Sequence, residues 1–81
     1  MPDVRALIAS VMRVSPDALH ENDGAETVPT WDSLKTIMLA SLIEITYDIT
    51  LDSSDIEQLT TVRAVREVIA RHVASQPDRG G

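Results

Sequence analysis

The segment VPTWDSLKTIMLASLIEIT, residues 28–46, decides the fold of this 81-residue chain. Asp32 or Ser33 can cap a helix here, because either side chain can accept a hydrogen bond from a free first-turn N–H group. From Leu34 to about Ile45 the segment is apolar on nearly all sides, which predicts a helix. One face holds Leu39, Ala40, Ile43 and Tyr47, and another holds Leu34, Met38, Leu42 and Ile45. A helix with two apolar faces is either fully buried or keeps one face for a partner.

The next stretch, ITYDITL at residues 45–51, alternates apolar and polar residues, as a β-strand does. No other segment of the chain alternates convincingly, so such a strand would have nothing to pair with. We therefore predict that the helix ends within this stretch and that a loop follows, with apolar residues that enter the core.

The N-terminal side predicts one helix and one long loop. Residues 3–13 form an apolar helical stripe of Val4, Leu7, Ile8, Val11 and Met12. Pro16 blocks further helix, and the polar segment that follows is long for a connection in so small a domain. Val14 and Leu19 are its predicted anchors in the core.

The C-terminal side predicts a short helix and a longer one. A capping box from Ser54 to Glu57 would open a short helix that ends near Leu59. Thr60 or Thr61 would then cap the last helix. The inner stripe of that helix would be Val62, Val65, Ile69 and Val73. The predicted fold is all-α: a small four-helix bundle of three main helices and one short helix, with a long first loop. We expect a single domain over residues 1–81, with a core at about 4–73 and a flexible tail at 75–81.

Composition excludes several function classes. The chain has no Cys, and its net charge is −6. Residues 14–62 hold ten acids and one base, so the acidity lies in the middle of the chain, which would repel nucleic acid and anionic lipid. His20 and His72 stand far apart, and no metal motif, Ser–His–Asp arrangement or Gly-rich phosphate loop is present. No apolar run is long enough for a membrane span. We expect a soluble, cytoplasmic monomer that is not an enzyme and binds neither nucleic acid, membrane nor metal.

Two motifs together carry a family resemblance. These are DSL at residues 32–34, opening a helix after a long loop, and ITLDSSDIEQLTTVRAVREVI at residues 49–69. With them the chain resembles an acyl carrier protein of the phosphopantetheine-binding carrier family, from about Val4 to Val73. The resemblance implies that Ser33 carries 4′-phosphopantetheine, moved from coenzyme A by a phosphopantetheinyl transferase. The thiol of this arm would hold an acyl cargo as a thioester for cargo-loading and acyl-transfer or condensing enzymes. Asp32 and Leu34 would flank the site and help the transferase recognise it.

The chain also departs from the usual pattern of that family. Trp31 replaces a Gly-rich approach to the Ser, and it either packs the loop against the helix end or contacts a partner. The sequence is in this respect similar to free-standing carriers of specialised pathways, polyketide or non-ribosomal. The predicted docking face holds Trp31, Leu34, Lys35, Met38, Ser41, Glu44 and Ile45. Lys35 and Met38 stand where acids are usual, which predicts a docking face that is more apolar and less sensitive to salt.

Two alternatives stay open at the level of sequence. One is an aminoacyl or D-alanyl-type carrier. The other is a helical protein-interaction module without a cofactor, in which Ser33 is only a helix cap. A start at Met1 favours a free-standing carrier over a domain excised from a larger synthase, and the sequence leaves the cargo unnamed.

Overall fold

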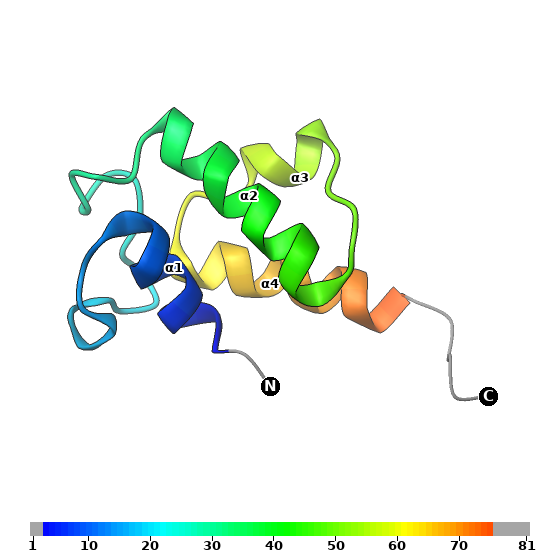
Figure 1. The fold of residues 1–81 in the computed structure, drawn as a ribbon, viewed down its shortest axis with the longest axis horizontal. Coiled ribbons are helices and arrows are strands. Elements are labelled where there is room, and N and C mark those ends of the chain that lie inside the picture. Colours follow the sequence, from blue (N-terminus) through cyan, green and yellow to red (C-terminus); the bar gives the residue numbers. More distant parts are fainter. Residues whose placement is uncertain (1–2, 76–81) are drawn as a thin grey trace.

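The computed structural model describes residues 3–75, and this part of the chain is helical, without strands (Figure 1). The elements are α1 (Val4–Met12), a short 3-10 helix η1 (Pro16–Ala18), α2 (Ser33–Tyr47), α3 (Ser53–Glu57) and α4 (Val62–Ser75). Helix α2 contacts α1, α3 and α4. The predicted all-α bundle of three main helices and one short one is confirmed. The predicted tail lies outside the described residues from position 76 onward, and Ser75 still belongs to α4.

Helix α2 has the two apolar faces that the sequence predicts. It begins after its N-cap Asp32 and ends at Tyr47, two residues later than expected, where Asp48 takes a left-handed conformation. One face is buried in the core and holds Leu39, Ala40 and Ile43. The other remains exposed, with exposed fractions of 64% for Leu34, 57% for Ile37, 48% for Met38 and 78% for Ile45. Since core packing accounts for only one face, the second is available to a partner.

The strand-like stretch after α2 is a helix end followed by a core-filling loop, as predicted. Ile49 and Leu51 are both buried. Their backbone is tied to the last turns of α2, because Ile49 N donates to the Glu44 carbonyl at 3.2 Å and Leu51 N donates to Glu44 Oε2 at 2.8 Å. The alternation therefore reflects apolar residues that turn inward at every second position of a loop.

The long first loop is packed on the core and fastened to the start of α4. Val14 packs partly buried against the core, and Leu19 is buried, so both predicted anchors are confirmed. Val28 is buried as well, which the sequence did not predict, and Trp31 is buried, which was one of the two alternatives for this residue. Backbone bonds hold the loop: Ala25 N donates to Thr60 O at 3.1 Å, Val62 N to Asp23 O at 2.9 Å, and Arg63 N to Glu21 O at 2.9 Å.

Two predictions about the C-terminal half are corrected. The capping box of α3 is formed by Asp52 and Asp55 rather than by Ser54 and Glu57, so the helix begins two residues earlier. Val73 is 44% exposed, whereas Val68 is buried with Val62, Val65 and Ile69. Val73 lies in the last turn of α4, and Figure 1 shows the end of α4 extending past the end of α2, so less of the bundle is available to cover this turn. Thr61 caps α4, accepting from Ala64 N at 3.0 Å.

Gly24 is where the loop comes closest to the α3–α4 junction, and it generates a stability prediction. A Cβ atom at this position would lie 1.8 Å from the carbonyl oxygen of Thr60, which is backbone and cannot turn away. We expect Gly24→Ala to lower the free energy of unfolding by about 1–3 kcal/mol. Urea denaturation measures this, with Glu26→Ala at an exposed position of the same loop as the control. Equal stability of the two variants would show that the close approach is not needed.

Candidate functional site

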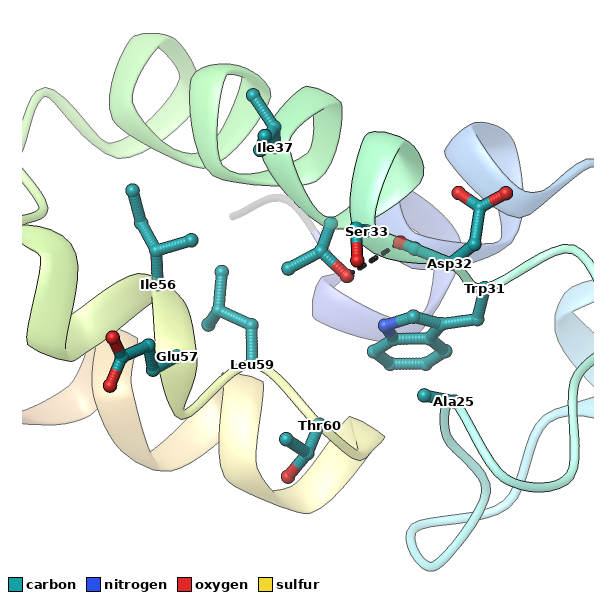
Figure 2. A pocket seen from close by; sticks show the side chains of 10 residues that line it. Ala25, Trp31, Asp32, Ser33, Ile37, Ile56, Glu57, Leu59 and Thr60 are labelled. Carbon is teal, nitrogen blue, oxygen red and sulfur yellow. Dashed lines mark hydrogen bonds between the residues drawn. The ribbon is translucent and has the colours of Figure 1, made fainter.

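Ser33 lies exposed at the N-terminal end of α2 because its neighbour caps the helix. Asp32 Oδ1 accepts from Lys35 N at 2.9 Å, and the Asp32 carbonyl accepts from Thr36 Oγ1 at 2.8 Å (Figure 2). Of the two caps that the sequence allowed, the structure uses Asp32. The hydroxyl of Ser33 therefore does not cap the helix, and Ser33 is exposed at the helix start.

The backbone around Ser33 favours a negatively charged group. The N–H groups of Ser33 and Leu34 belong to the first turn and have no intrahelical acceptor. The dipole of the 15-residue helix α2 adds positive potential at the same end, which stabilises an anion by about 0.3–1 kcal/mol. An anionic group linked through the oxygen of Ser33 would therefore lie at the helix end that stabilises negative charge.

A pocket of about 490 Å³ opens beside Ser33, between the start of α2, helix α3 and the first loop. Figure 2 shows Ile37, Ile56 and Leu59 on one side of this pocket and Trp31 and Ala25 on the other. The remaining lining residues are Asp32, Ser33, Thr36, Glu57 and Thr60. The pocket is mainly apolar inside, and Ser33 stands at its edge, so a flexible group attached to Ser33 can enter it.

Trp31 forms one wall of this pocket and is a core residue. Its side chain is only 2% exposed, which corrects its predicted place on the docking face. The bulk of the indole ring fills the space between the loop and the helix start in a core that has no Phe. Its Nε1–H is buried, and no acceptor within residues 3–75 bonds to it. An unpaired buried donor costs about 1–3 kcal/mol, so an acceptor that came within reach of this N–H would be stabilised.

Helix α3, the opposite wall, is tied to α4 by two side-chain contacts. His72 Nε2 lies 2.7 Å from Asp55 Oδ2, and Arg71 donates to Gln58 Oε1 at 2.6 Å. The hydrogen bond with His72 is the main reason why the pKa of Asp55 lies below its ordinary value of 3.8. Asp55 also closes the capping box with Asp52. Because one carboxylate serves both contacts, its ionisation affects how firmly this wall is held.

The structure leaves part of the residue set predicted for the docking face exposed. Leu34, Met38, Ser41 and Ile45 are exposed, and Lys35 is half-buried. The prediction that Glu44 belongs to the docking face is corrected. Glu44 is half-buried, and its carboxylate accepts a hydrogen bond from the backbone N–H of Leu51. Ile37 belongs to the face and was missed, although its position three residues after Leu34 could have indicated it. The resulting α2 patch, as we define it, is Leu34, Ile37, Met38, Ser41 and Ile45.

Within residues 3–75, His, Cys, Asp and Glu form no group of three or more that could hold a metal ion. None of the helices in that part of the chain has the length and apolar character needed to cross a bilayer.

Comparison with known proteins gives the fold a name. No family model matches the chain, and no curated protein matches its sequence. Among solved structures, it is similar to a holo acyl carrier protein from Geobacter metallireducens. The TM-score is 0.74 at 22% sequence identity, and the match covers 91% of this chain and 88% of that chain. The chain therefore has the acyl carrier protein fold.

The contact between Asp55 and His72 predicts a pH-dependent stability. The pKa of Asp55 is lower in the folded protein than its ordinary value of 3.8, so the ionised carboxylate stabilises the fold at pH values above 3.8. This stabilisation is lost as the pH falls through the lowered pKa. We expect Asp55→Asn, which keeps an acceptor for Asp52 N, to lower the free energy of unfolding at pH 7 by about 1 kcal/mol.

Urea denaturation at pH 7 and at several pH values below 3.8 tests this expectation. The difference between wild type and variant should shrink as the wild-type carboxylate is protonated. Glu57→Gln, on the exposed side of the same helix, is the matched control. A difference that stays constant over the whole pH range would rule out ionised Asp55 as its source.

Proposed function

We propose that this chain is an acyl carrier protein with Ser33 as the attachment point for 4′-phosphopantetheine. The observation that carries the proposal is an exposed Ser33 hydroxyl at the start of α2, released from capping by Asp32, in an acyl carrier protein fold. The solved neighbour is described as a holo carrier, which supports a prosthetic group of this kind.

The residues at the site fit such a group. Ser33 supplies the oxygen, and the first-turn N–H groups of α2 favour the phosphate charge. Trp31 and Leu59 wall a pocket into which the arm can fold. When attached, the group supplies a thiol that holds a cargo as a thioester. Loading would join the Ser33 oxygen to the pantetheine phosphorus, with 3′,5′-ADP leaving from coenzyme A and the hydroxyl proton passing to the transferase. The chain itself positions the arm and catalyses no step.

The α2 patch is the proposed docking surface for the transferase and for cargo-handling enzymes. Its exposed side chains are apolar apart from Ser41, and contiguous apolar surface of this kind marks interfaces. Contacts through apolar area depend little on ionic strength, whereas contacts between charges are screened. This surface favours dedicated partners of a specialised pathway, polyketide or non-ribosomal, over partners that bind a row of acids.

The alternative functions give Ser33 different roles. An aminoacyl or D-alanyl-type carrier would use the same arm with another cargo. A cofactor-free interaction module would need Ser33 only as a cap, and the structure assigns capping to Asp32 instead. The carrier proposal is therefore the one that gives the exposed hydroxyl a use.

The attachment point is tested by intact mass. After incubation with coenzyme A and a broad-specificity phosphopantetheinyl transferase, the wild type should gain the mass of one phosphopantetheine. Ser33→Ala should gain no mass. Its free energy of unfolding should lie within about 0.5 kcal/mol of the wild-type value, because the position is exposed and Asp32 still caps the helix.

Ser10→Ala, which removes an exposed hydroxyl from α1 outside the α2 patch, is the control and should load like the wild type. A wild type that stays unmodified by a transferase active on another carrier would overturn the proposal. Modification of the Ser33→Ala variant would move the attachment point to another residue.

The docking surface is tested by charge insertion. We expect Met38→Glu to raise the KM of the transferase about fivefold, corresponding to about 1 kcal/mol, with little change in kcat. Ala6→Glu introduces the same charge at an exposed position of α1 and should leave KM unchanged. Equal KM values for the two variants would argue against the α2 patch as the transferase surface.

A further inference from the structure

The Nε1–H of Trp31, beside the pocket at Ser33, is a hydrogen-bond donor without an acceptor among the described residues. This group is buried, although Trp31 also lines the pocket. Figure 2 shows the ring nitrogen on the edge of the indole that faces Ser33 and Leu59, and away from Ala25. A donor with no protein acceptor therefore points to the side from which a group on Ser33 would enter.

We propose that Trp31 donates a hydrogen bond from Nε1 to a carbonyl oxygen of the group carried on Ser33, and so holds that group in the pocket. This inference rests on the carrier function proposed above. It assigns a binding role to Trp31, whose side chain is too buried to belong to the docking surface.

The position of Trp31 in the chain brings donor and occupant together. Asp32 fixes the start of α2, so Trp31 turns into the core and Ser33, two residues later, turns to the surface. Both residues line the same pocket. Figure 2 shows Trp31 and Ile56 on opposite sides of Ser33, so an occupant anchored on Ser33 can contact the indole at one end of the pocket and the apolar side chains of α3 at the other.

The chemistry of the pocket selects a neutral acceptor. An indole N–H can only donate, so its partner must offer a lone pair. Two acidic residues, Asp32 and Glu57, are among those that line the pocket, and their negative charges disfavour a further negative charge inside it. The apolar surface of Ile37, Ile56 and Leu59 suits the hydrocarbon part of an occupant. A carbonyl on a largely apolar chain satisfies all three conditions.

Two sources can supply this carbonyl: the amides of the phosphopantetheine arm, and an oxygen on the cargo. The chain has a single Trp, so its indole N–H gives one side-chain resonance that reports on Trp31 alone. Three loaded forms separate the sources: the arm with a free thiol, a butyryl thioester and an acetoacetyl thioester. The loading of each is verified by intact mass.

We expect the indole proton resonance to move downfield relative to the apo protein, and its exchange with solvent to slow about tenfold, as for a hydrogen bond of ordinary strength. A shift already present with the free thiol assigns the acceptor to the arm. A shift that needs a thioester assigns it to the cargo, and the acetoacetyl form tests for a contribution of the keto oxygen.

Failure of the inference is distinguishable from failure of the carrier function. If all three forms are loaded and the indole resonance keeps its apo position and exchange rate, the role of Trp31 is overturned and the carrier function stands. If no form can be loaded, both are overturned.

Trp31→Phe keeps an aromatic ring and removes the donor. In the variant, the loading-dependent shifts of the Ile56 and Leu59 backbone amides should fall to less than half of their wild-type size, because the occupant is no longer held. Unchanged shifts would contradict the inference. The wild-type indole measurement does not depend on whether the variant folds.

Discussion

The cap of α2 is the constraint on which the rest of the site depends. A helix must satisfy its first N–H groups, and Asp32 does so for Lys35 at 2.9 Å. Because Asp32 holds the cap position, Trp31 precedes the helix and Ser33 is its first residue. Packing against the core then buries Trp31, whereas Ser33 stays exposed.

The pocket exists because the core is built around this junction without large rings to fill it. Trp31 is the only Trp of a chain that has no Phe. The loop that carries it is fastened through Gly24 to the α3–α4 junction, so that one wall is fixed to the backbone at Thr60. The other wall, α3, is a five-residue helix tied to α4 by side chains. One wall is therefore held by backbone bonds and the other by a titratable contact, and the second is the one more easily moved.

Helix α2 divides its apolar residues between stability and recognition. Leu39, Ala40 and Ile43 pack in the core, whereas the apolar side chains of the α2 patch are 48–78% exposed to water. The acidic residues of the middle segment lie mostly outside this patch; of those nearest to it, Glu44 is engaged with the backbone of Leu51. A surface of this composition gives the chain a means of recognition that differs from charge pairing.

The sequence by itself determined the helices and their order, because these depend on local chemistry, whereas Ser33 became the candidate attachment point through the resemblance to acyl carrier proteins. Apolar spacing at 3–4 residues predicts helices, and DSL after a long loop places Ser33 at a helix start. The two apolar faces of α2 were also readable, since the period of a helix is fixed. Even the end of α2 in a strand-like stretch followed from the lack of a pairing partner.

Only the tertiary structure decided what lies around these elements. Which of two adjacent residues caps α2, whether Trp31 faces the core or a partner, and whether Glu44 is free for docking all depend on contacts between distant segments. The same holds for Val73, which has the right spacing for the core but lies in the last turn of α4 and is 44% exposed. Periodicity states which side of a helix is apolar, but burial requires a second element at that side, and no local pattern encodes where that element ends.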